Sequence, residues 1–206
     1  MKLHLVLFTI FLAAIAGAQT CPIDEDFTAG RTQGARPQDP GEFTPEGWRV
    51  ASERTQIKYD LGKHYRKGSV ELEIRGPLNQ PLKRTAFAAW NEEAGADGDR
   101  KTQGFYQLRF QEGAMMLRLT YRAGGRSFEG KTDPVPWQDK WYKIRGTWDT
   151  AGGESHLWLD GKLLKSGKFN SAFEGFRWVF IGKDNYQQQF SIPGVVYRKL
   201  KVCVED

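Results

Sequence analysis

Polar and aromatic side chains suited to binding a sugar recur at every second position in several short segments of this sequence. Guanidinium, amide and imidazole groups can orient a sugar through hydrogen bonds, and an indole ring can stack on its apolar face. Alternation with period two places side chains of one parity on the same face of a strand. The candidate ligand-binding residues are Trp90, Asn91, Gln107, Arg109, Arg118, Arg145, His156 and Trp158. Because basic groups are frequent among them, an acidic polysaccharide is one candidate ligand.

The same residue types supply the parts of a lyase that acts on a uronic-acid polymer. Such an enzyme needs a general base and a group that neutralises the substrate carboxylate. His156 is one candidate base, and His64, with Tyr65 beside it, is the other. A basic row is also what an ordinary solvated strand face looks like, so the catalytic residues stay undetermined at this point.

Glycoside hydrolysis is not expected. A retaining glycosidase needs two carboxyl groups close together, one as nucleophile and one as acid. Glu71 and Glu73 share one strand face, but Arg75 occupies the next position on that face. We interpret this pair as part of a solvated polar face, and a non-catalytic role is therefore the first hypothesis.

The elements that must position these residues are short strands. Val70, Leu72 and Ile74 alternate with polar residues, as expected for a strand with one buried face. The same alternation recurs at residues 106–110, 115–121 and 142–148. Turn signals separate the segments, and the pattern contains no amphipathic helix of three turns. The sequence therefore predicts an all-β fold, a two-sheet antiparallel β-sandwich.

Less regular segments lie between these strands. An opening strand is expected at residues 23–27, followed by an irregular loop at residues 28–47 that is rich in Gly, Pro, Thr, Gln and Arg. A long polar loop is expected at residues 91–104, directly after Trp90. Loops at the ends of a sandwich are common places for binding residues, and this position favours Trp90 as an exposed ring.

The N-terminus has the features of a secretory signal peptide. Lys2 precedes an apolar stretch at residues 3–16, which is too short to span a bilayer comfortably. Ala16 and Ala18 have the spacing that a signal peptidase accepts. We expect a signal peptide at residues 1–18, one mature domain at residues 19–206, and a secreted, periplasmic or extracellular location. An uncleaved anchor and a lipidated Cys21 are the alternatives.

The charge of the chain is mildly basic, with a formal net charge of +5. This excess is no nucleic-acid signature, and it slightly favours acidic partners. No later segment is apolar enough for a membrane span, so none is expected after cleavage of the signal peptide. The expected partner is a polysaccharide or glycan.

The two cysteines, Cys21 and Cys203, lie at opposite ends of the expected mature chain. In an oxidising compartment we expect them to form one disulfide that closes nearly the whole chain into a loop. Two unpaired thiols are the alternative. A metal site made from these two residues alone is not expected, because a structural zinc site has four ligands.

Three runs of residues carry a resemblance to a known family. WYKIRGTWDTAGGESHLWLDGKLL contains a Trp-led strand that ends in Thr-Trp-Asp and a second strand that ends in Leu-Asp-Gly, FRWVFIGKDN closes a run of aromatics on Ile-Gly, and VVYRKLKVCV has the pattern of a last strand. Residues 137–182 and the last strand together resemble a concanavalin A-like lectin/glucanase domain, the group that includes laminin-G-like modules. The resemblance implies a two-sheet jelly roll with a concave sugar-binding face. It also implies that the last strand lies beside the first, which would bring Cys203 near Cys21.

The resemblance leaves the function open, because this superfamily contains lectins, glycoside hydrolases, polysaccharide lyases and adhesion modules. Its hydrolases carry an Asp between two Glu residues on one strand, and this sequence has no such pattern. The Gln-x-His strand motif of alginate-lyase relatives is also absent. The first hypothesis is a secreted, lectin-like carbohydrate-binding module. A small polysaccharide lyase and a structural or adhesion domain of the cell envelope are the alternatives.

No cofactor is expected, with calcium as the open alternative. Some relatives use calcium, and Asp97, Asp99, Asp184 and Asn185 offer oxygen ligands, although neither pair has EF-hand spacing. The sequence contains no phosphate-binding glycine motif, serine nucleophile elbow, HExxH motif or zinc-type cysteine pair.

Overall fold

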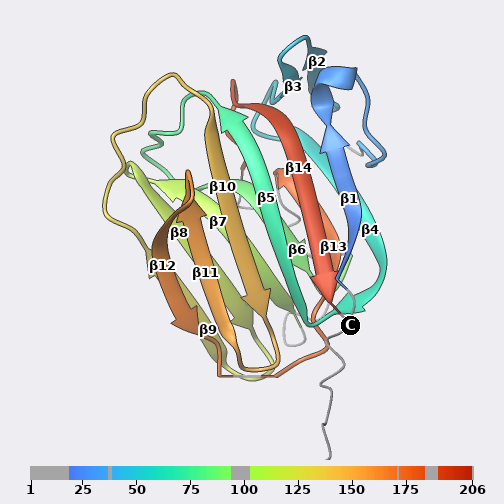
Figure 1. Cartoon of the computed structure of the whole chain (residues 1–206), viewed down its shortest axis with the longest axis vertical. Helices are drawn as coiled ribbons and strands as arrows, with labels where there is room; N and C mark the ends of the chain where they lie inside the picture. Colours follow the sequence, from blue (N-terminus) through green and yellow to red (C-terminus); the bar gives the residue numbers. More distant parts are fainter. Residues whose placement is uncertain (1–18, 37–38, 94–102, 171, 184–189, 206) are drawn as a thin grey trace, which may run out of the picture.

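The computed structural model describes residues 19–36, 39–93, 103–170, 172–183 and 190–205. Two antiparallel β-sheets pack face to face, one in front of the other in Figure 1. This arrangement confirms the predicted all-β sandwich. Within the described ranges no helix is long and apolar enough to cross a membrane. The signal peptide predicted at residues 1–18 lies outside the described residues and stays a prediction.

The first sheet, sheet A, has the strand order β12-β11-β10-β5-β14-β3-β2, and β1 also pairs with β14. A short 3-10 helix, η1 (Phe27–Ala29), follows the first strand. The strands of sheet A are β1 (Thr20–Asp26), β2 (Glu42–Thr44), β3 (Gly47–Arg49), β5 (Lys67–Arg75), β10 (Tyr142–Asp149), β11 (Glu154–Leu159), β12 (Lys162–Lys168) and β14 (Val196–Glu205).

The second sheet, sheet B, has the order β4-β13-β6-β7-β8-β9. Its strands are β4 (Gln56–Tyr65), β6 (Arg84–Trp90), β7 (Gly104–Gln111), β8 (Ala114–Tyr121), β9 (Arg126–Lys131) and β13 (Phe176–Gly182).

The alternation seen in the sequence is the alternation of inner and outer faces. In β10, Tyr142, Ile144 and Trp148 are buried, whereas Lys143 and Arg145 between them are exposed. The inner faces of both sheets form one apolar core. Burying these side chains is the main favourable contribution to folding, at about 25 cal/mol per Å² of apolar surface.

Aromatic rings join the two sheets through the core. The Trp148 ring of sheet A lies 5.5 Å from the Tyr106 ring of sheet B, measured between ring centroids. Position 146 is glycine because the Tyr106 hydroxyl group occupies the space that a Cβ atom would need. A side chain at Gly146 would therefore push the sheets apart at this point.

One hydrogen bond crosses between the sheets at a bulge. The register of β6 against β7 shifts between Thr85 and Phe87, which leaves Ala86 out of the regular pairing. The Tyr197 hydroxyl group of β14 donates to the Ala86 carbonyl over 2.8 Å. Burial raises the pKa of Tyr197 above its ordinary value, so the phenol stays protonated and keeps its donor.

The loop predicted at residues 28–47 is wrong in part. It contains η1 and β2, and β3 begins at Gly47. The Trp48 ring is fully buried and lies 6.3 Å from the Phe27 ring and 5.5 Å from the Tyr197 ring. Tertiary packing of Trp48 and pairing of β3 with β14 order a segment whose composition indicates a loop.

Two strands of sheet B were not predicted. In β4, Ile57, Tyr59 and Leu61 are buried with period two, which is a signal that the sequence does contain. Strand β9 offers little signal, because Phe128 is its only apolar side chain and it lies at the edge of the sheet.

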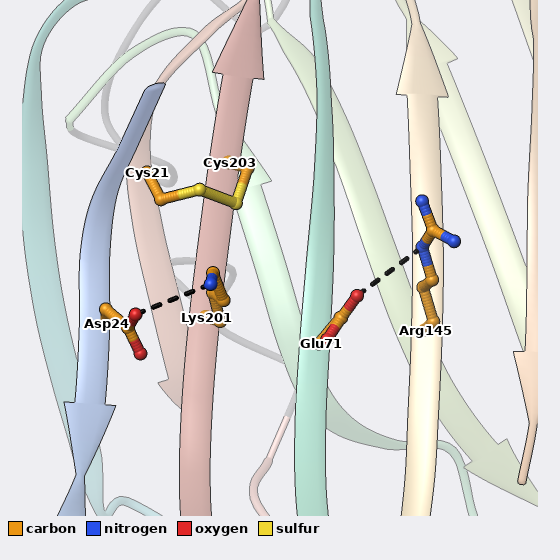
Figure 2. Close-up of a disulfide and its surroundings, with 6 residues drawn as sticks. All are labelled: Cys21, Asp24, Glu71, Arg145, Lys201 and Cys203. Carbon is orange, nitrogen blue, oxygen red and sulfur yellow. Dashed lines mark ion pairs between the residues drawn. A yellow bond between two sulfur atoms is a disulfide. The ribbon is translucent and has the colours of Figure 1, made fainter. Parts of the chain in front are cut away.

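The predicted disulfide is confirmed. Cys21 and Cys203 are bonded across a sequence separation of 182 residues, and the bond joins β1 to β14 (Figure 2). The strands also pair by backbone hydrogen bonds, in the register that places Ile23 opposite Val202. The first and last strands are therefore held side by side both covalently and by the sheet.

We expect the Cys21→Ser/Cys203→Ser double variant to unfold at lower denaturant concentration than the parent protein. Losing a cross-link across so long a loop removes about 5 kcal/mol in the chain-entropy description. Guanidinium unfolding followed by tryptophan fluorescence measures the difference. An unchanged midpoint would show that the denatured chain gains no freedom from the loss of this bond.

Candidate functional site

The predicted ligand-binding residues lie on two different outer faces. We use "outer face" for the side of each sheet that points away from the other sheet. Arg145, His156 and Trp158 lie on the outer face of sheet A. Gln107, Arg109 and Arg118 lie on the outer face of sheet B, together with Trp90 at the end of β6, and Asn91 follows directly after that strand. The eight residues therefore cannot line one site.

On sheet A, the predicted residues lie within a charge-balanced surface. Arg145 is 3.7 Å from Glu71 of the neighbouring strand, and its guanidinium lies 5.0 Å from the centre of the Trp158 ring. His156 is 3.7 Å from Glu154, and the His156 and Trp158 rings are 5.2 Å apart. Acidic neighbours thus accompany the basic groups that the sequence pattern places in a row.

On sheet B, the outer face carries a second, smaller apolar cluster. Its buried members are Ala88, Trp90, Phe105 and Phe180, with the half-buried Trp178 packed against them. The Trp90 and Phe105 rings are 4.8 Å apart. The prediction that Trp90 is an exposed ring is wrong, because its side chain packs into this cluster and has 0% exposure.

Polar residues continue this face beside the cluster. Gln107 and Arg109 are buried, with 0% and 1% exposure, and Gln107 lies opposite Arg118 across β7 and β8. Arg118 is half-buried, 3.6 Å from Glu129, with its guanidinium 5.1 Å from the centre of the Phe105 ring. A buried guanidinium on an outer face shows that this face is covered around Arg109, whereas the face of sheet A is open around Arg145.

Asn91 joins the ends of three segments. Its side chain donates to Glu174 over 2.8 Å and accepts from the Gly104 backbone N–H over 2.7 Å. Its backbone carbonyl lies 2.8 Å from Nε2 of His64. These contacts give Asn91 a structural role at the ends of β6 and β7.

The candidate lyase bases do not come together. His64 and Tyr65 lie at the end of β4 in sheet B, and His156 lies on β11 in sheet A. The Tyr65 ring has the Lys63 ammonium 5.1 Å from its centre. None of these three residues lines the pockets of about 300, 520 and 410 Å³ that the described residues form.

A pocket of about 410 Å³ lies at the β4 edge of sheet B, where the half-buried Trp178 ring forms part of its wall. The ring combines with an ammonium, a carboxylate and an amide side chain around one hollow, which is the residue set that sugar binding requires. The lining residues are Pro22, Ile23, Gln33, Ala35, Lys58, Tyr59, Asp60 and Trp178.

The segment that contributes Gln33 and Ala35 to the pocket is held by two sets of hydrogen bonds. Ala35 and Lys58 exchange both backbone hydrogen bonds over 2.8 Å, which attaches this segment to the edge of β4. Glu25 accepts from the Thr32 hydroxyl and from the Gln33 backbone N–H, each over 2.8 Å. The position of Gln33 beside the pocket is therefore fixed by the fold.

The floor of the pocket carries an ion pair. Arg177 donates to both carboxylate oxygens of Asp60, over 2.7 Å from Nε and 2.8 Å from Nη2. The Gly62 backbone N–H donates to the same carboxylate over 2.8 Å. The hydrogen bonds from Arg177 lower the pKa of Asp60 to about 2. Asp60 is thus a fixed acceptor at neutral pH.

Two cationic side chains lie beside the Trp178 ring. The Lys58 ammonium lies 5.1 Å from its centre and pairs with Glu93 over 2.6 Å. The Arg177 guanidinium lies 5.2 Å from the same ring centre. Cations favour the negative face of an indole ring, so these side chains hold the ring in place.

Sequence reasoning missed the Trp178 pocket. Trp178 and Phe180 point to the outer face of β13, whereas Phe176, Val179 and Ile181 point into the core, so apolar side chains occupy both faces of this strand. This pattern favours a core position for Trp178, and it does not reveal which face lies at an edge. Apolar residues on both faces of β13 were the signal in the sequence that could have predicted a covered outer face on sheet B.

Two other hollows are less suited to a sugar. One of about 520 Å³ is lined largely by aliphatic residues, including Pro134, Val135 and Leu163, and has no aromatic ring. One of about 300 Å³ lies among the charges on the outer face of sheet A. The calcium ligands considered above, at 97–99 and 184–185, lie outside the described residues. Within the described ranges no group of three or more metal-ligating side chains occurs.

Comparison with known proteins shows the fold. No protein-family model and no curated protein sequence matches the chain. Domain 4 of AbnA, an extracellular GH43 arabinanase from Geobacillus stearothermophilus, has a TM-score of 0.62 at 13% identity, covering 91% of this chain and 93% of that chain. The CBM40 of the Ruminococcus gnavus IT-sialidase has a TM-score of 0.57 at 16% identity, covering 78% and 92%. A SAP-like pentraxin from Limulus polyphemus has a TM-score of 0.50 at 16% identity, covering 80% and 73%. The chain shares their lectin-like β-sandwich fold.

The Asp60–Arg177 pair predicts how stability depends on pH. Because the folded pKa of Asp60 lies below its ordinary value of about 4, the pair contributes stability above that value, and the contribution is lost as pH falls towards about 2. We expect the melting temperature of Asp60→Asn to fall less steeply than that of the parent protein between these pH values. Thermal melts across this interval measure the difference, with Asp133→Asn, an exposed carboxylate elsewhere, as control. Parallel curves for Asp60→Asn and the parent would contradict the assignment.

Proposed function

We propose that this protein is a secreted, non-catalytic carbohydrate-binding module that recognises an acidic polysaccharide through the Trp178 pocket. The observation that carries the proposal is the half-buried Trp178 ring in a pocket of about 410 Å³ that also presents Lys58 and Asp60. The site differs from the one that the sequence pattern favours. It lies at the outer edge of sheet B, away from Arg145, His156 and Trp158.

The pocket has the composition of a sugar site. Ligand pockets range from about 300 to 1,000 Å³ and combine apolar walls with a few placed polar groups. The apolar face of a sugar ring packs on indole, and fixed acceptors such as the Asp60 carboxylate receive its hydroxyl hydrogens. The ion pair with Arg177 orients Asp60 before any ligand arrives, so little side-chain entropy is lost on binding.

The fold supports this class of function. The CBM40 of the Ruminococcus gnavus enzyme is described bound to α2,3-sialyllactose and to α2,6-sialyllactose, and AbnA domain 4 in complex with arabinotriose. Those ligands belong to those proteins. They show that this sandwich serves both acidic and neutral sugars, and fold alone does not choose between them.

Charge favours an acidic ligand here. The chain has a formal net charge of +5, and Lys58 places an ammonium at the rim of the pocket, with its side chain 23% exposed. Its partner Glu93 is 56% exposed, and an exposed ion pair of this kind contributes little stability. A ligand carboxylate can therefore replace Glu93 beside Lys58 at small cost.

A non-catalytic role and export complete the proposal. The candidate bases His64 and His156 lie on opposite sheets, and the pocket contains neither. The Cys21–Cys203 disulfide fits an extracellular or periplasmic location, where such bonds persist. Both points agree with a module that holds a polymer without cleaving it.

We expect Trp178→Ala to lower affinity for a bound oligosaccharide by about tenfold or more, or roughly 1.4 kcal/mol, because the stacking surface is lost. A glycan array identifies the ligand, and titration calorimetry measures the affinity. Trp158→Ala is the matched control, since Trp158 is a half-buried tryptophan on the outer face of sheet A. Equal losses of affinity in Trp178→Ala and Trp158→Ala would contradict the assignment of sugar binding to the Trp178 pocket. An array without any saccharide-dependent signal would overturn the function.

We expect Lys58→Gln to weaken binding of uronate-containing or sialylated oligosaccharides more than binding of neutral ones. Raising the salt concentration from about 50 mM to about 500 mM should have the same selective effect, because screening weakens exposed charge pairs. Parallel titrations with acidic and neutral oligosaccharides measure both effects. If neutral ligands bind as tightly and without salt dependence, the acidic preference is wrong and the module itself stands.

A further inference from the structure

Stripes of opposite charge cross the outer face of sheet A. Four neighbouring strands each present two outward side chains of the same charge, and the charge alternates from strand to strand. The acidic stripes are Asp24 and Asp26 of β1, and Glu71 and Glu73 of β5; the basic stripes are Lys199 and Lys201 of β14, and Lys143 and Arg145 of β10.

The register of the strands aligns these stripes into rows. Lys201 lies opposite Asp24 on one side and opposite Glu71 on the other, and Glu71 lies opposite Arg145. Figure 2 shows this row, one residue from each strand, with the Asp24–Lys201 and Glu71–Arg145 ion pairs drawn. In the next row, Lys199 lies opposite both Asp26 and Glu73, which in turn lies opposite Lys143.

The charges of the first row are loosely engaged within the chain, whereas Glu73 of the second row is 15% exposed and lies 3.0 Å from Arg198. The Asp24–Lys201 and Glu71–Arg145 pairs measure 3.5 Å and 3.7 Å, and all four side chains are between 43% and 67% exposed. Exposed pairs at such distances are worth little and leave carboxylate and cation surfaces open to solvent. The disulfide holds the acidic stripe of β1 next to the basic stripe of β14.

This pattern is complementary to itself. A two-fold axis that runs parallel to the strands, midway between β14 and β5, places each β14 stripe over the β5 stripe of a second copy. The same rotation places each β1 stripe over the β10 stripe of that copy. We propose that two copies of this chain associate through the outer faces of their sheets A, with Lys201 facing Glu71 and Asp24 facing Arg145 across the interface.

The dimensions of the face suit a modest dimer. The rotation superposes four strands of each copy, β1, β14, β5 and β10. At about 4.8 Å apart and roughly 25 Å long they offer on the order of 500 Å², less than the about 800 Å² per partner of a standard interface, as expected for a weak dimer. Packed sheets cross at about 30°, so the rows diverge away from the axis and the central β14 and β5 stripes dominate. A hollow of about 300 Å³ among Glu71, Glu73, Lys199 and Lys201 gives room for side chains of the second copy.

Such a dimer leaves the sheet B side of each Trp178 pocket free, whereas Pro22 and Ile23 of the pocket lining belong to β1, the sheet A strand that contributes Asp24 to the interface. The outer faces of the two sheets B point away from the interface, because each sheet B lies behind its own sheet A (Figure 1). The association therefore stands independently of the carbohydrate proposal. With a polymeric ligand it would add avidity, since two pockets would engage one polymer or two.

Sedimentation velocity of three proteins tests the proposal. The parent protein should show a monomer–dimer equilibrium, with a dissociation constant that rises with salt. Lys201→Glu places a carboxylate against Glu71 of the second copy, and Glu71→Lys places an ammonium against Lys201. Each variant alone should raise the dimer dissociation constant about tenfold or more, because like charges then meet twice across the axis. An equimolar mixture of the two variants should restore the dimer, because every facing pair is again of opposite sign.

Lys83→Glu is the control, because Lys83 is exposed, lies outside the sheet A face, and gives the same change in net charge. It should dimerise like the parent protein. Thermal melts confirm that each variant is folded, and Lys199→Glu with Glu73→Lys replaces the first pair of variants should either of those fail to fold, because Lys199 faces Glu73 in the same way. A parent protein that stays monomeric at the highest concentration overturns the proposal. So does an unchanged dimer in either variant, or a mixture that stays monomeric.

Discussion

The antiparallel pairing of β14 is the interaction on which the rest of the structure depends. Strand β14 pairs with β5 on one side and with β3 and β1 on the other, so it joins the first, central and last parts of the chain. Its inward Tyr197 packs on Trp48 and donates across the core to the Ala86 carbonyl of sheet B. The Cys21–Cys203 bond secures the same pairing covalently.

The outer faces of the two sheets differ in the burial of their side chains. On sheet A, Lys143, Arg145, Lys199 and Lys201 each have an acidic cross-strand neighbour, and the surface around Arg145 stays open. On sheet B, a buried aromatic cluster lies beside Gln107 and Arg109, and Trp178 lies at its margin. Burial of aromatic rings gives the outer face of sheet B a rigid apolar surface, whereas the outer face of sheet A carries alternating positive and negative charges. The charge pattern of sheet A suits a protein partner, and the apolar surface of sheet B suits a sugar ring.

The predicted site shows where period-two reasoning ends. Alternation placed Gln107 and Arg109 on one face, and Lys143 and Arg145 on another, as the strands have them. It could not say that these faces belong to opposite sheets. That assignment depends on which strands become neighbours, and each residue of β10 pairs with a residue of β5 that lies at least 68 positions away in the sequence. The prediction that the Trp90 ring is exposed was wrong for the same reason. The rings that bury it, Phe105 and Phe180, come from other strands.

The two cysteines of the sequence allowed one disulfide to be predicted. The sequence also determined the local properties of this protein: the strand periods, the inward faces and the turns. These follow from side-chain chemistry and spacing within a few residues. Tertiary structure alone decided which outer face is covered and which is open. It also decided that Trp178, Lys58 and Asp60 share a pocket, and that stripes of opposite charge are in register. Those outcomes depend on non-local strand pairing, whose register fixes the neighbours of every side chain.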